Sequence, residues 1–320
     1  MADAYTGTAA SDYDQTAWNL EAWYALRPEL YGDQLATIGT EPQSMKGSAV
    51  EFVFNNDLAA ATTALTETVT PDSVAMGDTT LTVTIAEYGN VVKKTKLLQA
   101  TSFIPFDPIA ANVVGYNAAI SLDTLAMNAL NGGTNVDYSD VSTHVTRVTQ
   151  GSGDIITATA VRKERAKLRG AFVQPFESGL YAAIIHPDVS YDLRGATDLA
   201  SWRAANVYVD TAHIMAGDLG IYEQFRFLET PRAGDLVNAG SGSTYDVYQT
   251  LFLGQQALAK AYASGDGAPG PNPIVRPGPI VDPLYRFAPI GWYWLGAYSI
   301  FRQAAVRRLE TISSIANNAS

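Results

Sequence analysis

The stretch Val50-Glu51-Phe52-Val53-Phe54, followed after residues 55–80 by Leu81-Thr82-Val83-Thr84-Ile85, decides the fold. Val50, Phe52 and Phe54 share one face of the first stretch, and the second stretch alternates apolar residues with threonines. This period-two pattern predicts two β-strands. Residues 55–80 are too many for a hairpin turn, and connections of that length are usually functional or disordered. We therefore expect a strand–long loop–strand unit.

The predicted unit is acidic throughout. Residues 47–92 contain no lysine or arginine and six acids: Glu51, Asp57, Glu67, Asp72, Asp78 and Glu87. Such a segment is attracted to basic surface. The sequence itself offers one basic run, residues 162–169, with five basic residues and one acid. This run either docks an acidic neighbour or is simply the solvated face of a helix.

A long helix is expected at residues 107–130. Asp107 suits its N-cap and Pro108 its first position, apolar residues follow at helical spacing, and Asn131-Gly132-Gly133 ends it. A helix of that length is a rod of about 35 Å. No βαβ regularity accompanies it.

The rest of the chain mixes short elements. Residues 180–185 read as a buried strand, 221–228 and 245–252 as alternating strands, and 266–289, rich in proline, as an ordered extended loop. Residues 292–315 are long enough for a helix, but their aromatic residues favour a strand that bends into another. Without βαβ units, this mixture predicts an α+β fold.

Composition narrows the classes of function. The 320 residues are 47% apolar and only 17% charged, which indicates a folded chain whose surface is partly covered by neighbouring subunits, or else a β-rich domain. A net charge of −11 argues against reading a nucleic acid sequence, although an acidic wall would repel enclosed DNA. No membrane span or secretory signal is recognised, so we expect a cytoplasmic origin.

No catalytic or metal-binding pattern emerges. The chain lacks cysteine, and its three histidines, His144, His186 and His213, have no ligand spacing. No nucleophile elbow, phosphate loop or dinucleotide fingerprint is present. We therefore expect no enzyme activity, no cofactor and no metal.

Several stretches together resemble the major capsid proteins of tailed bacteriophages, which have the HK97-like fold, and in particular the branch typified by the capsid protein of coliphage N4. They are residues 60–67 (AATTALTE), 87–90 (EYGN), 184–193 (IIHPDVSYDL), 217–230 (GDLGIYEQFRFLET), 252–254 (FLG), 282–284 (DPL) and 291–292 (GW). Their order and spacing extend over about residues 50–310. One departure is Glu67-Thr68, where that branch commonly has Glu-Gly.

The resemblance implies a division of the chain. Its expected parts are an N-terminal arm (1–46), an extended loop (47–92), a peripheral domain (93–156 and 290–320) with a spine helix (107–130), and an axial domain (157–289). Many copies would form hexamers and pentamers of an icosahedral virion shell around packaged DNA, assembled in the bacterial cytoplasm. Scaffolding, portal and decoration proteins would be separate partners.

The resemblance also sharpens two expectations about contacts between copies. Residues 57–80 contain no lysine, so we expect no covalent cross-link through the extended loop. Acids of the loop are expected to rest on basic residues of a neighbour, and the candidates on the two sides are Glu51, Asp57, Glu67, Asp72 and Asp78 against Arg162, Arg165, Arg169, Arg302, Arg307 and Arg308. The alternatives are an encapsulin-like nanocompartment shell and a β-rich carbohydrate-binding protein or enzyme.

Overall fold

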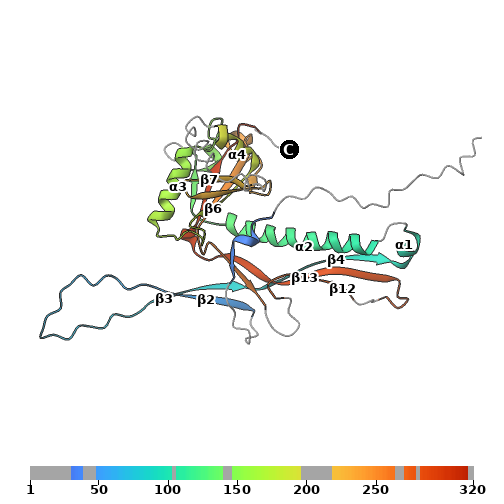
Figure 1. Ribbon diagram of the computed structural model, residues 1–320, viewed down its shortest axis with the longest axis horizontal. Coiled ribbons are helices and arrows are strands. Elements are labelled where there is room, and N and C mark those ends of the chain that lie inside the picture. Colours follow the sequence, from blue (N-terminus) through green and yellow to red (C-terminus); the bar gives the residue numbers. More distant parts are fainter. Residues whose placement is uncertain are drawn as a thin grey trace, which may run out of the picture.

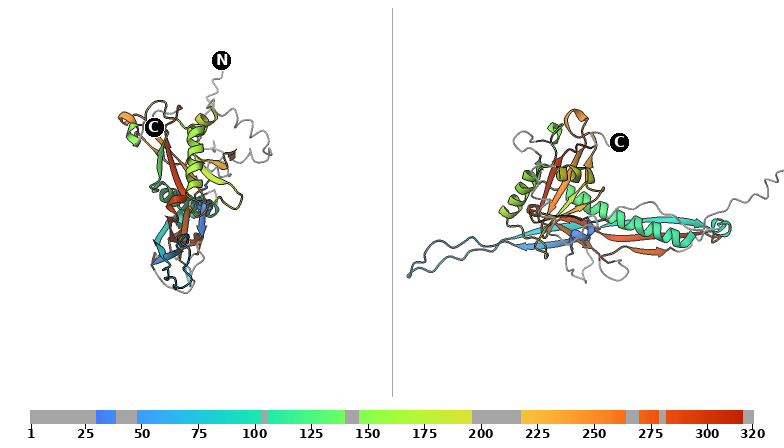
Figure 2. Two further views of the ribbon diagram at one scale, coloured as in Figure 1. Left: turned by 90° about the vertical axis from the view of Figure 1, so that its left-hand side faces the viewer. Right: turned by 45° about the horizontal axis from the view of Figure 1, so that its top comes forward.

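The computed structural model describes residues 30–38, 48–102, 106–139, 146–195, 218–263, 270–278 and 282–315. Figure 1 shows an elongated body, in which one long helix lies along a long antiparallel strand pair, and a lobe that sits above one end of it. A hairpin projects beyond the same end. Figure 2 shows from two further sides that this hairpin stands clear of the lobe.

The hairpin consists of β2 (Ala49–Asn55) and β3 (Asp78–Thr84), paired antiparallel with Phe52 opposite Leu81. The predicted strands are thus confirmed. Beyond them, the Asn56 N–H donates to the Gly77 carbonyl at 2.9 Å, which closes the neck of the connecting loop. We call residues 49–84 the flap. Residues 86–92, expected in the same unit, instead begin β4 (Ala86–Thr95), which belongs to the body.

The predicted long helix is α2 (Phe106–Asn131), which begins one residue before the expected cap. Its buried face packs on two tryptophans of β13 (Phe287–Ile300). Trp292 Nε1 donates to Asn117 Oδ1 of the helix at 2.8 Å, and Trp294 is fully buried. The short α1 (Lys96–Thr101) follows β4 at the end of the body away from the lobe (Figure 1).

The body sheet has five strands. Its order is β1 (Ala36–Ile38), β11 (Leu258–Tyr262), β13 and β12 (Ile274–Pro277), with β4 also paired to β13. The expectation that residues 266–289 form only a loop was therefore wrong. β12 is an edge strand that ends at Pro277, a place where a residue without an N–H is tolerated. Of the expected N-terminal arm, only residues 30–38 are described.

The lobe sheet has seven strands. Six follow the order β5 (Val136–Tyr138), β14 (Val306–Thr311), β10 (Val247–Leu253), β6 (Tyr181–Ile185), β8 (Phe225–Glu229) and β7 (Asp218–Tyr222), while β9 (Asp235–Leu236) pairs with β10. The helices α3 (Ala158–Gly170) and α4 (Pro187–Gly195) flank it (Figure 1). Single-turn 3-10 helices lie at Asp33–Leu35, Arg147–Thr149, Ser241–Ser243 and Gln303–Ala305.

One sequence expectation needs correction in the lobe, and one is confirmed. Residues 221–228 are not one strand, because Glu223 and Gln224 take positive φ values of 50° and 64° and turn the chain between β7 and β8. The C-terminal segment bends from one strand, β13, into another, β14, as its aromatic residues indicated. β14 belongs to the lobe sheet, whereas β11, β12 and β13 belong to the body sheet.

A buried ion-pair cluster joins α3 to the lobe sheet. Glu164 accepts from Arg307 Nε at 2.7 Å, and Arg307 and Lys167 both also bond to Asp137 on β5. The Glu164 side chain is 2% exposed. Burial and the nearby Asp137 carboxylate raise the pKa of Glu164 to about 7, whereas hydrogen bonds from Lys167 and Arg307 hold the pKa of Asp137 below its usual value.

Replacing Arg307 with Met should destabilise the subunit by about 3–5 kcal/mol, because two buried carboxylates lose their shared cation. Urea unfolding of the unassembled chain measures this loss. The matched control is Arg162→Met on the exposed face of α3, which should change the free energy of unfolding by no more than about 0.5 kcal/mol. Equal effects of the two substitutions would contradict the structural role of Arg307.

The stability of the subunit should depend on pH through Glu164. The carboxyl titrates near 4.5 when unfolded and near 7 when folded, so between these values the unfolded chain binds fewer protons and stability falls as pH rises. From about pH 5 to about pH 8 the native chain should lose up to about 3 kcal/mol relative to Glu164→Gln. Thermal unfolding of both chains across this range tests the sign, and a gain for the native chain would contradict it.

Candidate functional site

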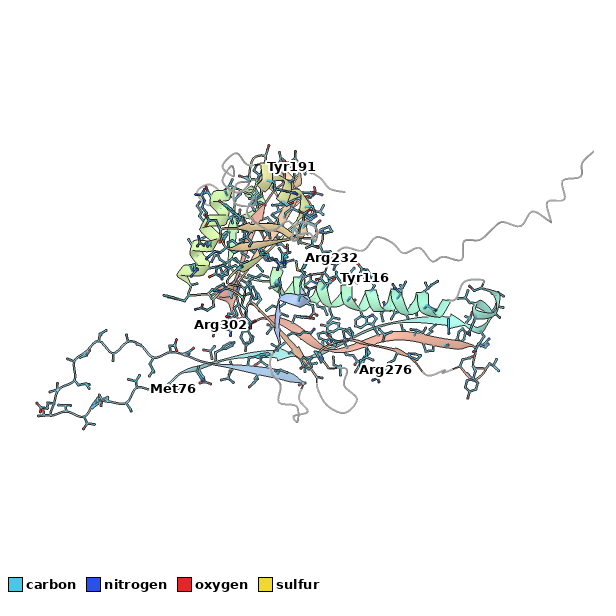
Figure 3. The ribbon with its side chains drawn as sticks, in the orientation of Figure 1. Met76, Tyr116, Tyr191, Arg232, Arg276 and Arg302 are labelled. Atoms are coloured by element: carbon cyan, nitrogen blue, oxygen red, sulfur yellow. The ribbon has the colours of Figure 1, made fainter. Side chains whose placement is uncertain are left out.

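The loop of the flap has no burial within its own subunit. Every residue from 55 to 80 is exposed. Five of them carry large apolar side chains that are more than half exposed: Leu58, Leu65, Val69, Val74 and Met76. Figure 3 shows Met76 on the flap, well away from the body. Water-exposed apolar side chains gathered in one segment mark a surface that another molecule covers.

The root of the flap, by contrast, is fixed. The rings of Phe52 and Phe54 meet Phe301 edge to face, with centroids 5.3 and 4.8 Å apart. The Arg302 guanidinium lies 5.5 Å from the Phe54 ring, a cation–π distance. Figure 3 shows Arg302 where the flap, body and lobe meet. Arg302, expected to contact a neighbour, therefore already contacts the flap of its own subunit.

The basic run folds as α3, whose N-cap Thr157 accepts from the Ala160 N–H. The helix has one buried face and one exposed face. Glu164 and Leu168 are buried, whereas Arg162, Lys163 and Arg169 are exposed. Arg165 donates to Glu223 at 2.6 Å, and Arg165 and Arg169 both donate to Gln224 Oε1. The helix therefore presents a basic outer face, of which Arg165 is partly neutralised inside the subunit.

The last two basic candidates lie inside the lobe. Arg307 belongs to the Glu164 and Asp137 cluster. Arg308 is 9% exposed; it donates to the Asn131 carbonyl, and its Nε lies 3.0 Å from Glu310 Oε1 without hydrogen-bond alignment. Arg307 and Arg308 are neighbours on β14, so their side chains point to opposite faces of the strand, and each meets an acidic residue of its own subunit. We therefore set Arg307 and Arg308 aside as docking residues.

The acids of the flap all remain at its surface. Glu51 faces Thr82 across the strand pair, and Asp78 begins β3. Asp57, Glu67 and Asp72 lie in the exposed loop among the apolar side chains. The sequence reasoning found these acids but did not single out the apolar residues between them. The sequence did contain a signal for them: a segment too long for a turn carries large apolar side chains without the periodicity of a strand.

The described residues contain no group of three metal-ligating side chains. The His186 ring is tilted against that of Tyr248, with ring centroids 4.7 Å apart, and its Nδ1 accepts from the Asp188 N–H at the start of α4. Burial lowers the pKa of His186. The arrangement is that of a helix-start histidine that holds its turn. His144 and His213 lie outside the described residues.

An open hollow of about 710 Å³ lies between the end of α2 and the lobe. Its three arginines are all engaged: Arg147 and Arg308 with Glu310, and Arg232 with Asp123 (Figure 3 labels Arg232). The Arg232–Asp123 pair joins the lobe to α2, and the described residues that line the hollow present no arrangement of reactive side chains. Among the described helices, none combines the length and apolar composition that a membrane span requires.

Comparison with known proteins identifies the class. The model of a family described as phage capsid protein matches residues 36–308. A search of curated proteins finds no match. Among solved structures, the capsid of Ralstonia phage GP4 has 16% identity and a TM-score of 0.74 over 98% of both chains. The capsid of cyanophage Pam1 has 16% identity and a TM-score of 0.77, over 98% of this chain and all of that one.

The head structure of Helicobacter pylori bacteriophage KHP40 is also similar, at 12% identity and a TM-score of 0.70 over 97% of this chain and 99% of that one. These likenesses agree with the observed mixed helix and sheet architecture, which is that of the HK97-like fold. The family match extends over most of the chain and favours a phage shell over a nanocompartment or a carbohydrate-binding protein. The chain belongs to the phage capsid protein family, as a major capsid protein of a phage head.

Proposed function

We propose that the flap of each copy lies over a neighbouring copy, and that copies joined in this way build the icosahedral head of a tailed phage from hexamers and pentamers. The observation that carries this proposal is the complete exposure of residues 55–80, with five large apolar side chains among them. Such a segment reduces its apolar contact with water only when another molecule covers it.

The symmetry of a closed shell suits a contact of this kind. A flap on one subunit and its receptor on the next make a heterologous contact, which closes into rings when the rotation fits. Because every subunit gives one flap and receives another, individually modest contacts hold each copy at several points. The resemblance to the branch of coliphage N4 supports the assignment to tailed phages.

We assign the parts of the shell subunit from this resemblance and from the two sheets. The flap lies within the extended loop (47–92), α2 is the spine helix, and the lobe is the axial domain. The sheet pairing suggests that β11 and β12 go with the peripheral domain and β14 with the axial domain. The partners are other copies, enclosed DNA that is not read by sequence, and separate scaffolding, portal and decoration proteins.

The chemistry of the subunit is consistent with a structural role alone. We propose no enzyme activity and no cofactor, assembly in the host cytoplasm, and no covalent cross-link through the flap, because residues 57–80 contain no lysine. The outer face of α3 offers the flap a receptor of opposite charge, through Arg162, Lys163 and Arg169.

Shortening the flap tests the proposal directly. Replacing residues 57–76 with Asn-Gly joins Asn56 to Gly77, which already share a hydrogen bond, through a two-residue turn suited to a hairpin. The subunit should keep its thermal unfolding temperature, since the removed residues are exposed, and should no longer form shells in sedimentation and negative-stain microscopy. Normal shells from this variant would contradict the proposal.

Reversing charges tests the receptor. Arg162→Glu with Lys163→Glu changes exposed residues and spares the Arg165–Glu223 pair, and it should reduce shell formation, more strongly at low salt. Glu67→Lys with Asp72→Lys on the flap should restore assembly when combined with it. If neither pair affects the yield of shells, the charged face of α3 is not the receptor.

A further inference from the structure

One aromatic residue of the lobe has an unusual backbone. α3 ends in three tight hydrogen bonds, from Ala171 N–H to the Lys167 carbonyl, from Phe172 N–H to that of Arg169, and from Val173 N–H to that of Leu168. The last of these spans six residues and marks a Schellman ending, whose next-to-last residue is left-handed and usually glycine. Here that residue is Phe172, with φ of +58°.

A bulky residue at positive φ is a conformational outlier, because its Cβ crowds the backbone. The surroundings hold it there. On one side the helix fixes Phe172 through the bond to Arg169, and on the other Val173 packs against the buried core and accepts from the Tyr181 hydroxyl at 2.8 Å. Strain of this kind persists where neighbouring structure over-determines it, and it is often functional.

The Phe172 side chain is almost uncovered within its own subunit. It is 89% exposed, more than any other exposed large apolar side chain among the described residues. A glycine would suit the backbone better, and a polar residue would suit the solvent better. A phenylalanine at this position is therefore explained when a second molecule covers the ring.

The neighbourhood of Phe172 indicates what that molecule is. The ring follows directly on the basic outer face of α3, formed by Arg162, Lys163 and Arg169. A ring beside positive charges matches a partner that is both apolar and acidic. A second copy of the same face would be repelled, since it has the same charge.

We infer that Phe172 is the anchor on which the flap of a neighbouring copy docks. Leu65, Val69 and Val74 of that flap would cover the ring, while Glu67 and Asp72 meet the basic face. Both features lie in one exposed segment of the flap. This inference rests on the proposed function, to which it adds the residue that receives the flap. Protein interfaces typically have an apolar centre in which aromatic side chains are enriched, and a polar rim around it.

Phe172→Gly separates the two roles of the residue. Glycine adopts the left-handed conformation freely, so the melting temperature of the unassembled subunit should rise, by roughly 1–4 °C. The yield of shells should fall strongly, because the anchor is gone. Phe172→Leu is the matched control: it keeps an apolar side chain on the same strained backbone and should retain assembly without the rise.

Two results would overturn the inference. If Phe172→Gly assembles as well as the native chain, the ring anchors nothing. If its melting temperature falls instead, the ring is held by its own subunit. Either result leaves the flap proposal standing as long as the shortened flap still fails to assemble, so the two failures are distinguishable.

Disulfide trapping locates the contact. The chain has no cysteine, so Ala171→Cys combined with Val69→Cys introduces the only two thiols, one beside the anchor and one in the flap. Mild oxidation of assembled shells should give covalent multimers on non-reducing gels. Val148→Cys with Val69→Cys, at a site 67% exposed elsewhere on the lobe, should give none. Multimers in the control but not in the Ala171 pair would place the flap on another surface and contradict the inference.

Discussion

The packing of α2 on β13 is the interaction on which the rest of the structure depends. β13 has 14 residues; it pairs with β4, β11 and β12 and places Trp292 and Trp294 beneath the helix. The same strand leads through Phe301 to the root of the flap and on to β14 in the lobe. One rigid core therefore sets the direction of the flap and the position of the lobe together.

A molecule built in this way cannot bury all of its apolar surface alone. The core is long and narrow, so the loop of the flap projects beyond it, and every residue from 55 to 80 is exposed (Figure 1). A low charged fraction is expected of surfaces that neighbours cover, and the sequence is only 17% charged. The chain belongs to the phage capsid protein family, and our proposal that copies cover one another's flaps accounts for this exposed apolar surface.

Local patterns predicted the parts of the fold that local forces determine. The alternation around Phe52 and Leu81 and the helical spacing after Pro108 were sufficient for the flap strands and α2. Sequence could not show that β11 joins the body sheet and β14 the lobe sheet, since that depends on pairing between strands far apart in the chain. It also read Arg307 as free surface, when Glu164 and Asp137 surround it, and nothing near Phe172 signalled a left-handed turn, because glycine is absent from that position.

The central claim is that residues 55–80 are covered only in the assembly. Hydrogen–deuterium exchange of the flap, compared between unassembled subunits and intact shells, measures this most directly. Amides of residues 57–76, which lie outside β2 and β3, should exchange freely in the subunit and should become protected in shells. Equally fast exchange in intact shells, or protection already present in the lone subunit, would contradict the account.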